Sequence, residues 1–586
     1  MNKRSQTYWW ILSWMVSGVV ASAAQAVDSG TLYRHHSIGA STFLQSEHGK
    51  VFQQVWQMPV TAVFGKHLGT NLSLVAHSLF TAGTNPPPAE SLGILQSFLQ
   101  DLADHESLLD VRAPGGRTEW TLAVQLPPPR RAAWDQGIRN LLKAGKLGES
   151  KSASWAGVSG SQAILASGKL SWLASGDWLV VGLASNLPTI WKATVGELRS
   201  SKRPVPALTS NAWMHIDADL AKLSKAFPVI PEFLDARLDL TLVGKGENVR
   251  MDGTLRFPTP LGWEPVEWDV PINLIHDPVV GFSAARGIGA LTSRSEDLRK
   301  LGLTSFPNQA SAWSMAGLPY LAFAAFPQPG SSNLLRETLP RIPNLITNYG
   351  RLIGEMTWVS NTTQVLWRGM PFVNPSLRAI TEGSKEYMVG GLMPFFTSKR
   401  KAPPELFGFM GRTNLAYYDW EITETRVRSW SRIVQSSLIG FFRESPSTNA
   451  PVQALMECLG EKGLLGNSVT EITVTGPSEL TLMRQSHVGL TGLEIVSGLR
   501  WVDSARFPFT FDRAPALDLS RRRSSVRAAS PTNQTRAVVA PRAGKSPLQK
   551  PTPRLPAPPV VKTPVVPGAP KVAPPTRSED PTPKPN

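Results

Sequence analysis

Apolar residues recur with two different periods along the middle of the chain, and each period predicts one kind of element. Between residues 130 and 144 they recur every three or four positions, which predicts an amphipathic helix ending at Gly145. The apolar face of this helix consists of Trp134, Ile138, Leu141 and Leu142. Apolar runs at residues 169–173 and 178–183, on either side of a Ser-Gly-Asp turn, predict a β-hairpin.

Two longer hairpins have the same character. One is predicted to join strands at residues 237–243 and 249–257, and the other to join strands at residues 469–475 and 480–488. Strands that meet at tight turns form antiparallel sheet, and helical segments between such strands cover the sheet. The predicted fold class is therefore α+β.

Similar patterns occur twice in the same order, which predicts an internal duplication. Three segments of the first half have counterparts by eye in the second: 119–126 with 319–326, 178–183 with 387–392, and 212–219 with 416–423. We therefore expect two related halves of mostly antiparallel sheet with helices on one face, at residues 27–262 and 263–513. The boundary is placed in the proline-rich passage 257–278.

The order of these elements resembles that of large exported bacterial proteins of unknown function, in which a duplicated strand–helix–hairpin body follows a signal peptide. The resemblance rests on four segments: 211–219, 237–257, 414–423 and 469–488. It implies export and a duplicated α+β body, and it brings no activity and no catalytic residues.

The N-terminus has the layout of a secretory signal peptide at residues 1–26. Lys3 and Arg4 precede an uncharged stretch at residues 5–27, which contains the cleavage pattern Ala24-Gln25-Ala26. We expect cleavage after Ala26; the alternative is an uncleaved membrane anchor. With one cysteine in 586 residues the chain forms no internal disulfide, which favours the bacterial periplasm or cell surface over eukaryotic secretion.

The net charge of +16 is concentrated at the C-terminus. Residues 521–586 contain 13 basic and two acidic residues, 16 prolines and no aromatic residue, a composition typical of a disordered tail, which we place at residues 514–586. Residues 27–520 carry only +3, which argues against nucleic acid as a partner. An anionic envelope polymer or a membrane surface is the partner that the tail favours.

Two groups of ionisable residues qualify as candidate sites, and both have simpler explanations. His215, Asp217 and Asp219 share one face of a predicted strand, but Asp219 precedes a predicted helix and is expected to cap it. The second group, Asp101, Asp104, His105 and Glu106, is predicted to be the solvated face of a helix. His35 and His36 are expected at the surface.

No catalytic residue, metal ligand or cofactor can be assigned from the sequence. H-E-x-x-H is missing from it, as is a complete G-x-S-x-G, and Cys458 is expected to pack as a small apolar residue. The leading hypothesis is a non-enzymatic envelope scaffold or binding protein. The alternatives are a carrier of a lipid or other apolar ligand, whose cavity would be lined by the many tryptophans and phenylalanines, and a hydrolase of wall or polysaccharide.

Overall fold

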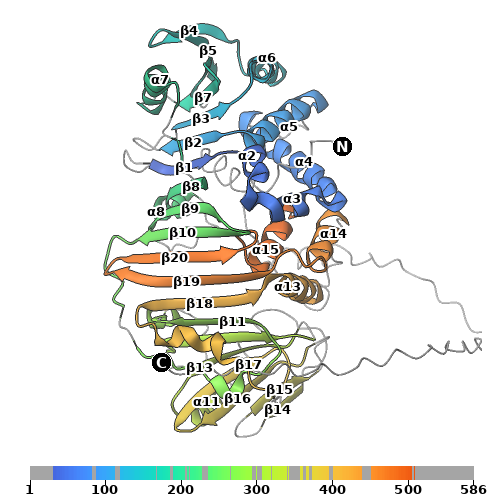
Figure 1. Ribbon diagram of the computed structural model, residues 1–586, viewed down its shortest axis with the longest axis vertical. Helices are drawn as coiled ribbons and strands as arrows, with labels where there is room; N and C mark the ends of the chain where they lie inside the picture. The colour runs from blue at the N-terminus through green and yellow to red at the C-terminus, as the bar shows by residue number, and fades with distance from the viewer. Residues whose placement is uncertain are drawn as a thin grey trace, which may run out of the picture. The chain divides into compact units, whose positions relative to one another are not determined.

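A single antiparallel β-sheet extends through the folded part of the chain. The computed structural model describes residues 31–81, 88–112, 119–165, 168–184, 189–204, 207–209, 211–226, 235–263, 266–293, 298–299, 306–317, 320–338, 341, 357–360, 364–368, 373–394, 400–437, 450–504 and 507. The predicted signal peptide and the predicted tail at residues 514–586 lie outside these residues. Within them, 20 strands form one sheet, and every neighbouring pair is antiparallel (Figure 1).

The strands fall into two sets of ten. The first set is β1 (Thr31–Ser37), β2 (Ser107–Arg112), β3 (Glu119–Gln125), β4 (Lys151–Trp155), β5 (Val158–Leu165), β6 (Gly168–Ser175), β7 (Trp178–Ala184), β8 (Ala212–Asp219), β9 (Arg237–Lys245) and β10 (Asn248–Arg256). The second set is β11 (Val279–Arg286), β12 (Gln309–Met315), β13 (Ala322–Pro327), β14 (Thr357–Ser360), β15 (Gln364–Arg368), β16 (Ser376–Glu382), β17 (Lys385–Gly391), β18 (Leu415–Ile422), β19 (Asn467–Gly476) and β20 (Glu479–Ser486).

The pairing order confirms that the two halves are related. From its outer edge the first set runs β4-β5-β6-β7-β3-β2-β1-β8-β9-β10. The second set runs β14-β15-β16-β17-β13-β12-β11-β18-β19-β20, the same order with each strand number raised by ten. The halves meet where β10 pairs with its own counterpart β20. The predicted α+β class with two antiparallel halves is thus confirmed, and both halves belong to one sheet.

The strand register corrects two of the alignments made by eye. Gln125 pairs with Trp178 as Pro327 pairs with Tyr387, so β3 and β13 correspond at a spacing of 202 residues instead of 200. The bulge between Ala212 and Met214 in β8 recurs between Leu415 and Tyr417 in β18, which gives a spacing of 203 instead of 204. Small insertions and bulges shift a register in ways that residue types alone do not reveal.

The two long hairpins form as predicted, with shorter turns. β9 and β10 are joined by Gly246-Glu247 alone, and β19 and β20 by Pro477-Ser478 alone. The helix predicted at residues 130–144 begins slightly earlier, at Pro128, because proline is favoured in the first helical turn.

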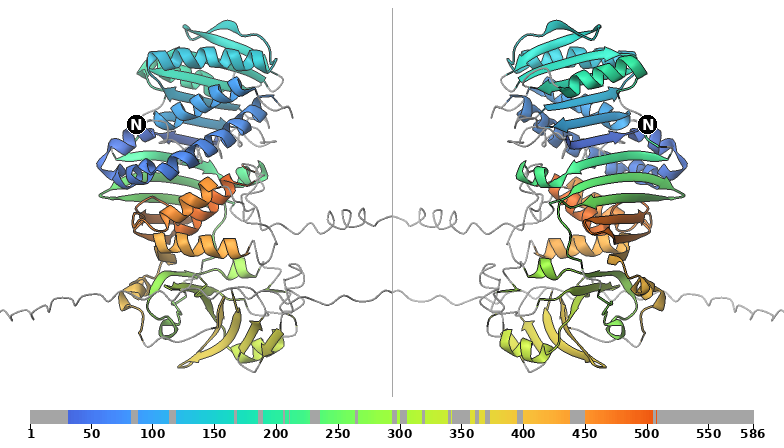
Figure 2. Two further views of the ribbon diagram at one scale, coloured as in Figure 1. Left: turned by 90° about the vertical axis from the view of Figure 1, so that its right-hand side faces the viewer. Right: turned by 90° about the vertical axis from the view of Figure 1, so that its left-hand side faces the viewer.

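The helices of the structure are α2 (Ala40–Gln45), α3 (Lys50–Gln57), α4 (Pro59–Thr81), α5 (Ala89–Asp104), α6 (Pro128–Ala144), α7 (Thr189–Ser201), α8 (Leu220–Ala226), α9 (Gly289–Thr292), α11 (Ser331–Thr338), α13 (Thr423–Ser437), α14 (Ala450–Leu459) and α15 (Gly492–Val502), with short 3₁₀ segments η2 (Glu47–Gly49), η4 (Ile272–Leu274) and η5 (Pro404–Gly411). Figure 2 shows α4, α5 and α6 in front of the strands in its left view and α7 in front of them in its right view. Within the described part of the chain, none of the helices combines the length and apolarity that a bilayer crossing requires.

One hydrophobic core joins the two halves on the face that most of the helices cover. Phe43 and Trp56 from the first half pack in the same cluster as Leu455 and Ile495 from the second. Helices of the second half therefore bury apolar surface of the first, so the halves stabilise each other.

On the opposite face of the sheet, Trp191 of α7 packs against β7 at Gly182, where a larger residue would leave no room for the ring. Trp191 is fully buried, and a Cβ on Gly182 of β7 would lie 2.7 Å from its Cε3 atom. Real Cβ atoms do not approach a ring so closely, and a packed core transmits the resulting strain.

We therefore expect Gly182→Ala to lower the free energy of unfolding by about 1–3 kcal/mol because it displaces Trp191. The matched control is Gly196→Ala within α7, where a Cβ meets no atom within 4 Å. This control should raise stability by up to about 1 kcal/mol, since alanine favours helix. Urea unfolding of the three proteins measures both changes; equal effects at the two sites would contradict the packing argument.

Candidate functional site: a buried polar cluster

Two carboxylates of β18 are buried beneath the helices of the second half. Asp419 is 9% exposed and Glu421 is 4% exposed, and both lie on the strand face that the helices cover. Burying a carboxylate is unfavourable unless charges and hydrogen bonds compensate. The surroundings of these two residues therefore form the candidate functional site.

Asp419 is held by β11 and lies near an arginine of β20. The hydroxyl of Ser283 donates a hydrogen bond of 2.5 Å to its Oδ1 atom. Burial raises the pKa of Asp419, and the Ser283 hydrogen bond and the charge of Arg484 oppose this rise. Arg484 also donates to Thr470 Oγ1 at 2.9 Å and to both carboxylate oxygens of Glu494, at 2.7 and 3.0 Å.

Glu421 lies at the N-terminus of α15. The backbone N–H of Gly492 donates to its Oε1 atom at 2.6 Å, and the Arg426 guanidinium lies 3.8 Å from its Oε2 atom. A helix N-terminus favours a negative charge through its free N–H groups. Burial nevertheless raises the pKa of Glu421 to about 7, with the Gly492 hydrogen bond offsetting part of the effect.

Two glycines make room for the Arg426 side chain. A Cβ on Gly281 of β11 would lie 3.0 Å from Arg426 Cδ, and a Cβ on Gly492 would lie 2.7 Å from Arg426 Cβ. The same close approach of α15 to α13 brings the Gly492 N–H within reach of Glu421. Glycine at both positions is therefore part of the geometry of the cluster.

The duplication shows that the fold does not require this cluster. The cross-strand pair Ser283–Asp419 corresponds by register to the pair His35–Ile216 in the first half. Glu421 corresponds to Ala218 by the same register. The first half forms the same sheet with an apolar isoleucine and alanine at these positions, so the carboxylates of the second half are an addition to the shared fold.

The chemistry open to this cluster is proton exchange. Glu421 can gain or lose a proton near neutral pH, which changes the charge that faces the N-terminus of α15. Because both carboxylates are buried, a polymeric substrate cannot reach them as a glycosidase mechanism requires. The geometry supports a structural, pH-sensitive link between β18 and α15.

The residues His215, Asp217 and Asp219 lie on one face of β8 as predicted, but each has its own partner. Asp219 Oδ1 accepts a hydrogen bond from the backbone of Lys222 at 3.0 Å, which confirms the predicted helix cap. Asp217 pairs with Arg237 at 2.6 Å, and His215 lies 3.4 Å from Asp239. Across the described ranges, no three His, Cys, Asp or Glu side chains are grouped so as to hold a metal ion.

The prediction of a solvated face at the end of α5 is wrong for Asp101. This residue is 6% exposed and lies between α5 and α6, where Arg130 and the indole N–H of Trp134 donate to its carboxylate. The residues of α5 alone do not show that a second helix packs beside it.

The prediction of a surface position for His35 and His36 is also wrong. Both are buried because β1 lies in the interior of the sheet, between β2 and β8. Burial lowers the pKa of His35 to about 3. The imidazole of His36 lies 2.9 Å from Glu106, to which Arg203 also donates at 2.5 Å, so Glu106 too belongs to an ion-paired group.

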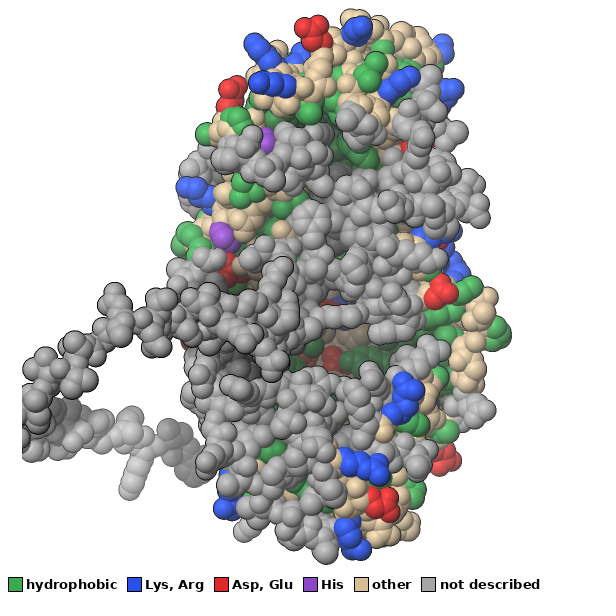
Figure 3. Space-filling model, turned by 180° about the vertical axis from the view of Figure 1, so that it is seen from behind, with side chains coloured by type: hydrophobic (Ala, Val, Ile, Leu, Met, Phe, Trp, Pro, Cys, Tyr) green, Lys and Arg blue, Asp and Glu red, His purple; other side chains and the backbone are tan. Residues whose placement is uncertain are grey.

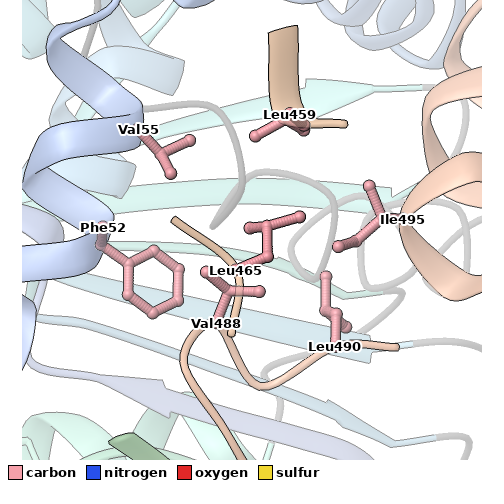
Figure 4. A pocket seen from close by; sticks show the side chains of 7 residues that line it. All are labelled: Phe52, Val55, Leu459, Leu465, Val488, Leu490 and Ile495. Atoms are coloured by element: carbon pink, nitrogen blue, oxygen red, sulfur yellow. The ribbon is translucent and has the colours of Figure 1, made fainter. Parts of the chain in front are cut away.

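The apolar pocket in Figure 4 lies where the two halves meet. Phe52 and Val55 of α3 face a group of apolar residues from the second half: Leu459, Leu465, Val488, Leu490 and Ile495. Its volume is about 20 Å³, room for one water molecule. This pocket is therefore too small for a lipid chain. Cys458, on neighbouring α14, packs its Sγ atom 3.4 Å from Met58 Sδ, in keeping with a packing role.

Glu421 should make stability depend on pH. Its folded-state pKa of about 7 exceeds the ordinary 4.5, so between these values the folded protein keeps a proton that the unfolded chain has released. The free energy of unfolding therefore falls as pH rises from 4.5 to 7, by about 3 kcal/mol at 1.36 kcal/mol per pH unit.

Glu421→Gln keeps an acceptor for the Gly492 N–H and removes the titration. Its unfolding free energy, measured by urea titration from pH 4 to 8, should lack this decline. The opposite trend from His35, which destabilises the fold as pH falls below 6.5, is common to both proteins and cancels in the comparison. The exposed control Glu479→Gln should follow the unmodified chain, and parallel profiles for all three would refute the assignment.

Asp101 should contribute far more to stability than its neighbour in the same helix. Asp101→Ala removes the carboxylate that accepts hydrogen bonds from both Arg130 and the Trp134 indole, and we expect a loss of about 3–5 kcal/mol. Asp104→Ala removes a hydrogen bond from Gln100 and should cost about 1 kcal/mol. Thermal and urea unfolding compare the two variants; losses of equal size would mean that the contacts of Asp101 add little.

Comparison with protein-family models, with curated proteins and with solved structures found no match to this chain.

Proposed function

We propose that this chain is an exported, non-enzymatic scaffold of the bacterial cell envelope, held at an anionic polymer or membrane surface by its basic tail. The observation that carries the proposal is the separation of charge: residues 521–586 have a net charge of +11, and residues 27–520 have +3. A cationic segment of this size attracts anionic surfaces, and the attraction weakens as salt increases.

The folded part supports this division because its charged residues pair with one another. On the central strands, Arg237 pairs with Asp217, Arg250 with Asp252, and Arg256 with Glu479. In Figure 3 the basic and acidic side chains of the described residues are interspersed on the face shown. Interspersed charges of both signs attract a charged polymer less strongly than a patch of one sign does.

The geometry of the site supports a scaffold over the two alternatives, which are a hydrolase of wall or polysaccharide and a carrier of an apolar ligand. The carboxylate pair of β18 is buried away from any polymer, and the apolar pocket between the halves accommodates one water molecule. The continuous sheet with its shared core instead favours a scaffold role.

The tail should account for binding to anionic surfaces. We expect the full chain to co-sediment with vesicles rich in anionic lipid, or with an acidic polysaccharide gel, and to bind at least about tenfold more weakly when salt increases from about 0.1 M to 0.5 M. A variant in which the 13 basic residues of the tail are replaced by glutamine should not bind.

The control is a variant with Lys→Gln and Arg→Gln changes at exposed positions of the folded part, which should bind like the unchanged chain. Protein produced with its own N-terminus in a bacterial host also reports, by its intact mass, whether cleavage follows Ala26. Undiminished binding by the neutral-tail variant would refute the proposed tether, and protein retained in the cytoplasm would refute export.

A further inference from the structure

A polar groove lies between α13 and α14, outside the cluster described above. Its volume is about 260 Å³, and residues from both helices and from the segment after α14 line it. The two helices lie side by side on the right of Figure 1. The groove is slightly smaller than sites for drug-sized ligands, which occupy roughly 300–1,000 Å³, so a ligand of about the size of an amino acid fits it.

The two walls of this groove carry opposite charges. Arg428 and Arg432 of α13 form one wall, and Glu457 of α14 with the following Glu461 forms the other. Opposite charges on facing walls provide separate places for an anionic and a cationic group.

Some of these charges remain available to a ligand. Arg428 Nε donates to the carbonyl of Gly460 at 2.9 Å, so this arginine is already engaged in fixing the end of α14. Glu457 accepts a hydrogen bond of 2.7 Å from Gln453, and a carboxylate can accept several more. Among the contacts of the described residues, Arg432 and Glu461 form no ion pair.

The floor of the groove is fixed even though its rim is exposed. Ser431 is 6% exposed and Met456 is 1% exposed, and both are anchored in the packed helices. A rigid floor between charged walls favours binding because the charged groups start from a preorganised base.

The comparison of the two halves shows that the shared sheet does not require the connection that forms this groove. In the first half, the connection between β8 and β9 contains the seven-residue helix α8. In the second half the corresponding connection between β18 and β19 contains α13 and α14, of 15 and ten residues. The groove therefore belongs to an enlarged connection that the shared sheet does not need.

We propose that this groove binds a small zwitterion, with its anionic group on Arg432 and its ammonium group on Glu457 and Glu461. Every ligand of this class carries an ammonium group a few ångströms from a carboxylate or a phosphate. A free amino acid provides the first arrangement and a phosphoethanolamine headgroup the second. This site is independent of the tail and adds a ligand to the proposed scaffold.

Calorimetric titration of the full chain tests the proposal with four probes: L-alanine, O-phosphoethanolamine, propionate and ethylamine. We expect at least one zwitterion to bind with Kd below about 10 mM, and at least about tenfold more tightly than either singly charged probe. The comparison of L-alanine with O-phosphoethanolamine distinguishes a carboxylate from a phosphate as the anionic group.

Arg432→Gln and Glu457→Gln should each weaken binding about tenfold, because each removes one charged partner. Both side chains lie at the exposed rim of the groove, so the variants should fold, which circular dichroism verifies. Arg256→Gln and Glu479→Gln, an exposed ion pair on the sheet, are matched controls and should leave binding unchanged. The neutral-tail variant should also bind normally, which separates this site from the tether.

The proposal is overturned if neither zwitterion binds in this range, or if propionate or ethylamine binds as tightly as the zwitterions. It is also overturned if the control substitutions weaken binding as much as those in the groove.

Discussion

The pairing of β10 with β20 is the interaction on which the rest of the molecule depends. Their register extends from Val249–Ser486 to Arg256–Glu479 and unites two ten-strand sets in one sheet. Without it, each half would end in an open edge of unpaired backbone groups. It also brings α13, α14 and α15 over the same core as α2 and α3, so the hydrophobic core spans the junction.

The two related halves provide an internal comparison that separates what the shared sheet requires from what only one half contains. The first half fills the covered face of β8 with Ile216 and Ala218, whereas the second has Asp419 and Glu421 at the matching register. Replacing buried ion pairs by apolar residues is often neutral or stabilising, so stability alone does not account for the carboxylates. Their position links the charge of Glu421 to the N-terminus of α15, because the Gly492 N–H donates to the Glu421 carboxylate.

Local features of the fold could be predicted from the sequence, and long-range ones could not. Helix α6 and the β9–β10 and β19–β20 hairpins follow from short periodic patterns and turn residues. The burial of His35 and Asp101 depends on segments far away in the chain that pack against them. Asp419 and Glu421 are visible in the sequence as carboxylates at alternate positions of a largely apolar strand. This alternation predicts that they share one face of the sheet, but it does not predict whether helices cover that face.

The two halves differ chiefly in the connections between matching strands. Helices α2, α3, α4 and α5 lie between β1 and β2, and α13 and α14 lie between β18 and β19, whereas the matching connections of the opposite half contain only the short helices α9 and α8 among the described residues. In the second half, the buried cluster of β18 and the α13–α14 connection lie among strands that pair in the same order as β8, β9 and β10. The same pairing order is therefore compatible with different side chains on the covered face of the sheet and with connections of different length. Both the cluster around Glu421 and the proposed groove lie in parts of the second half that differ from the first, whereas the pairing order of the strands is common to both halves.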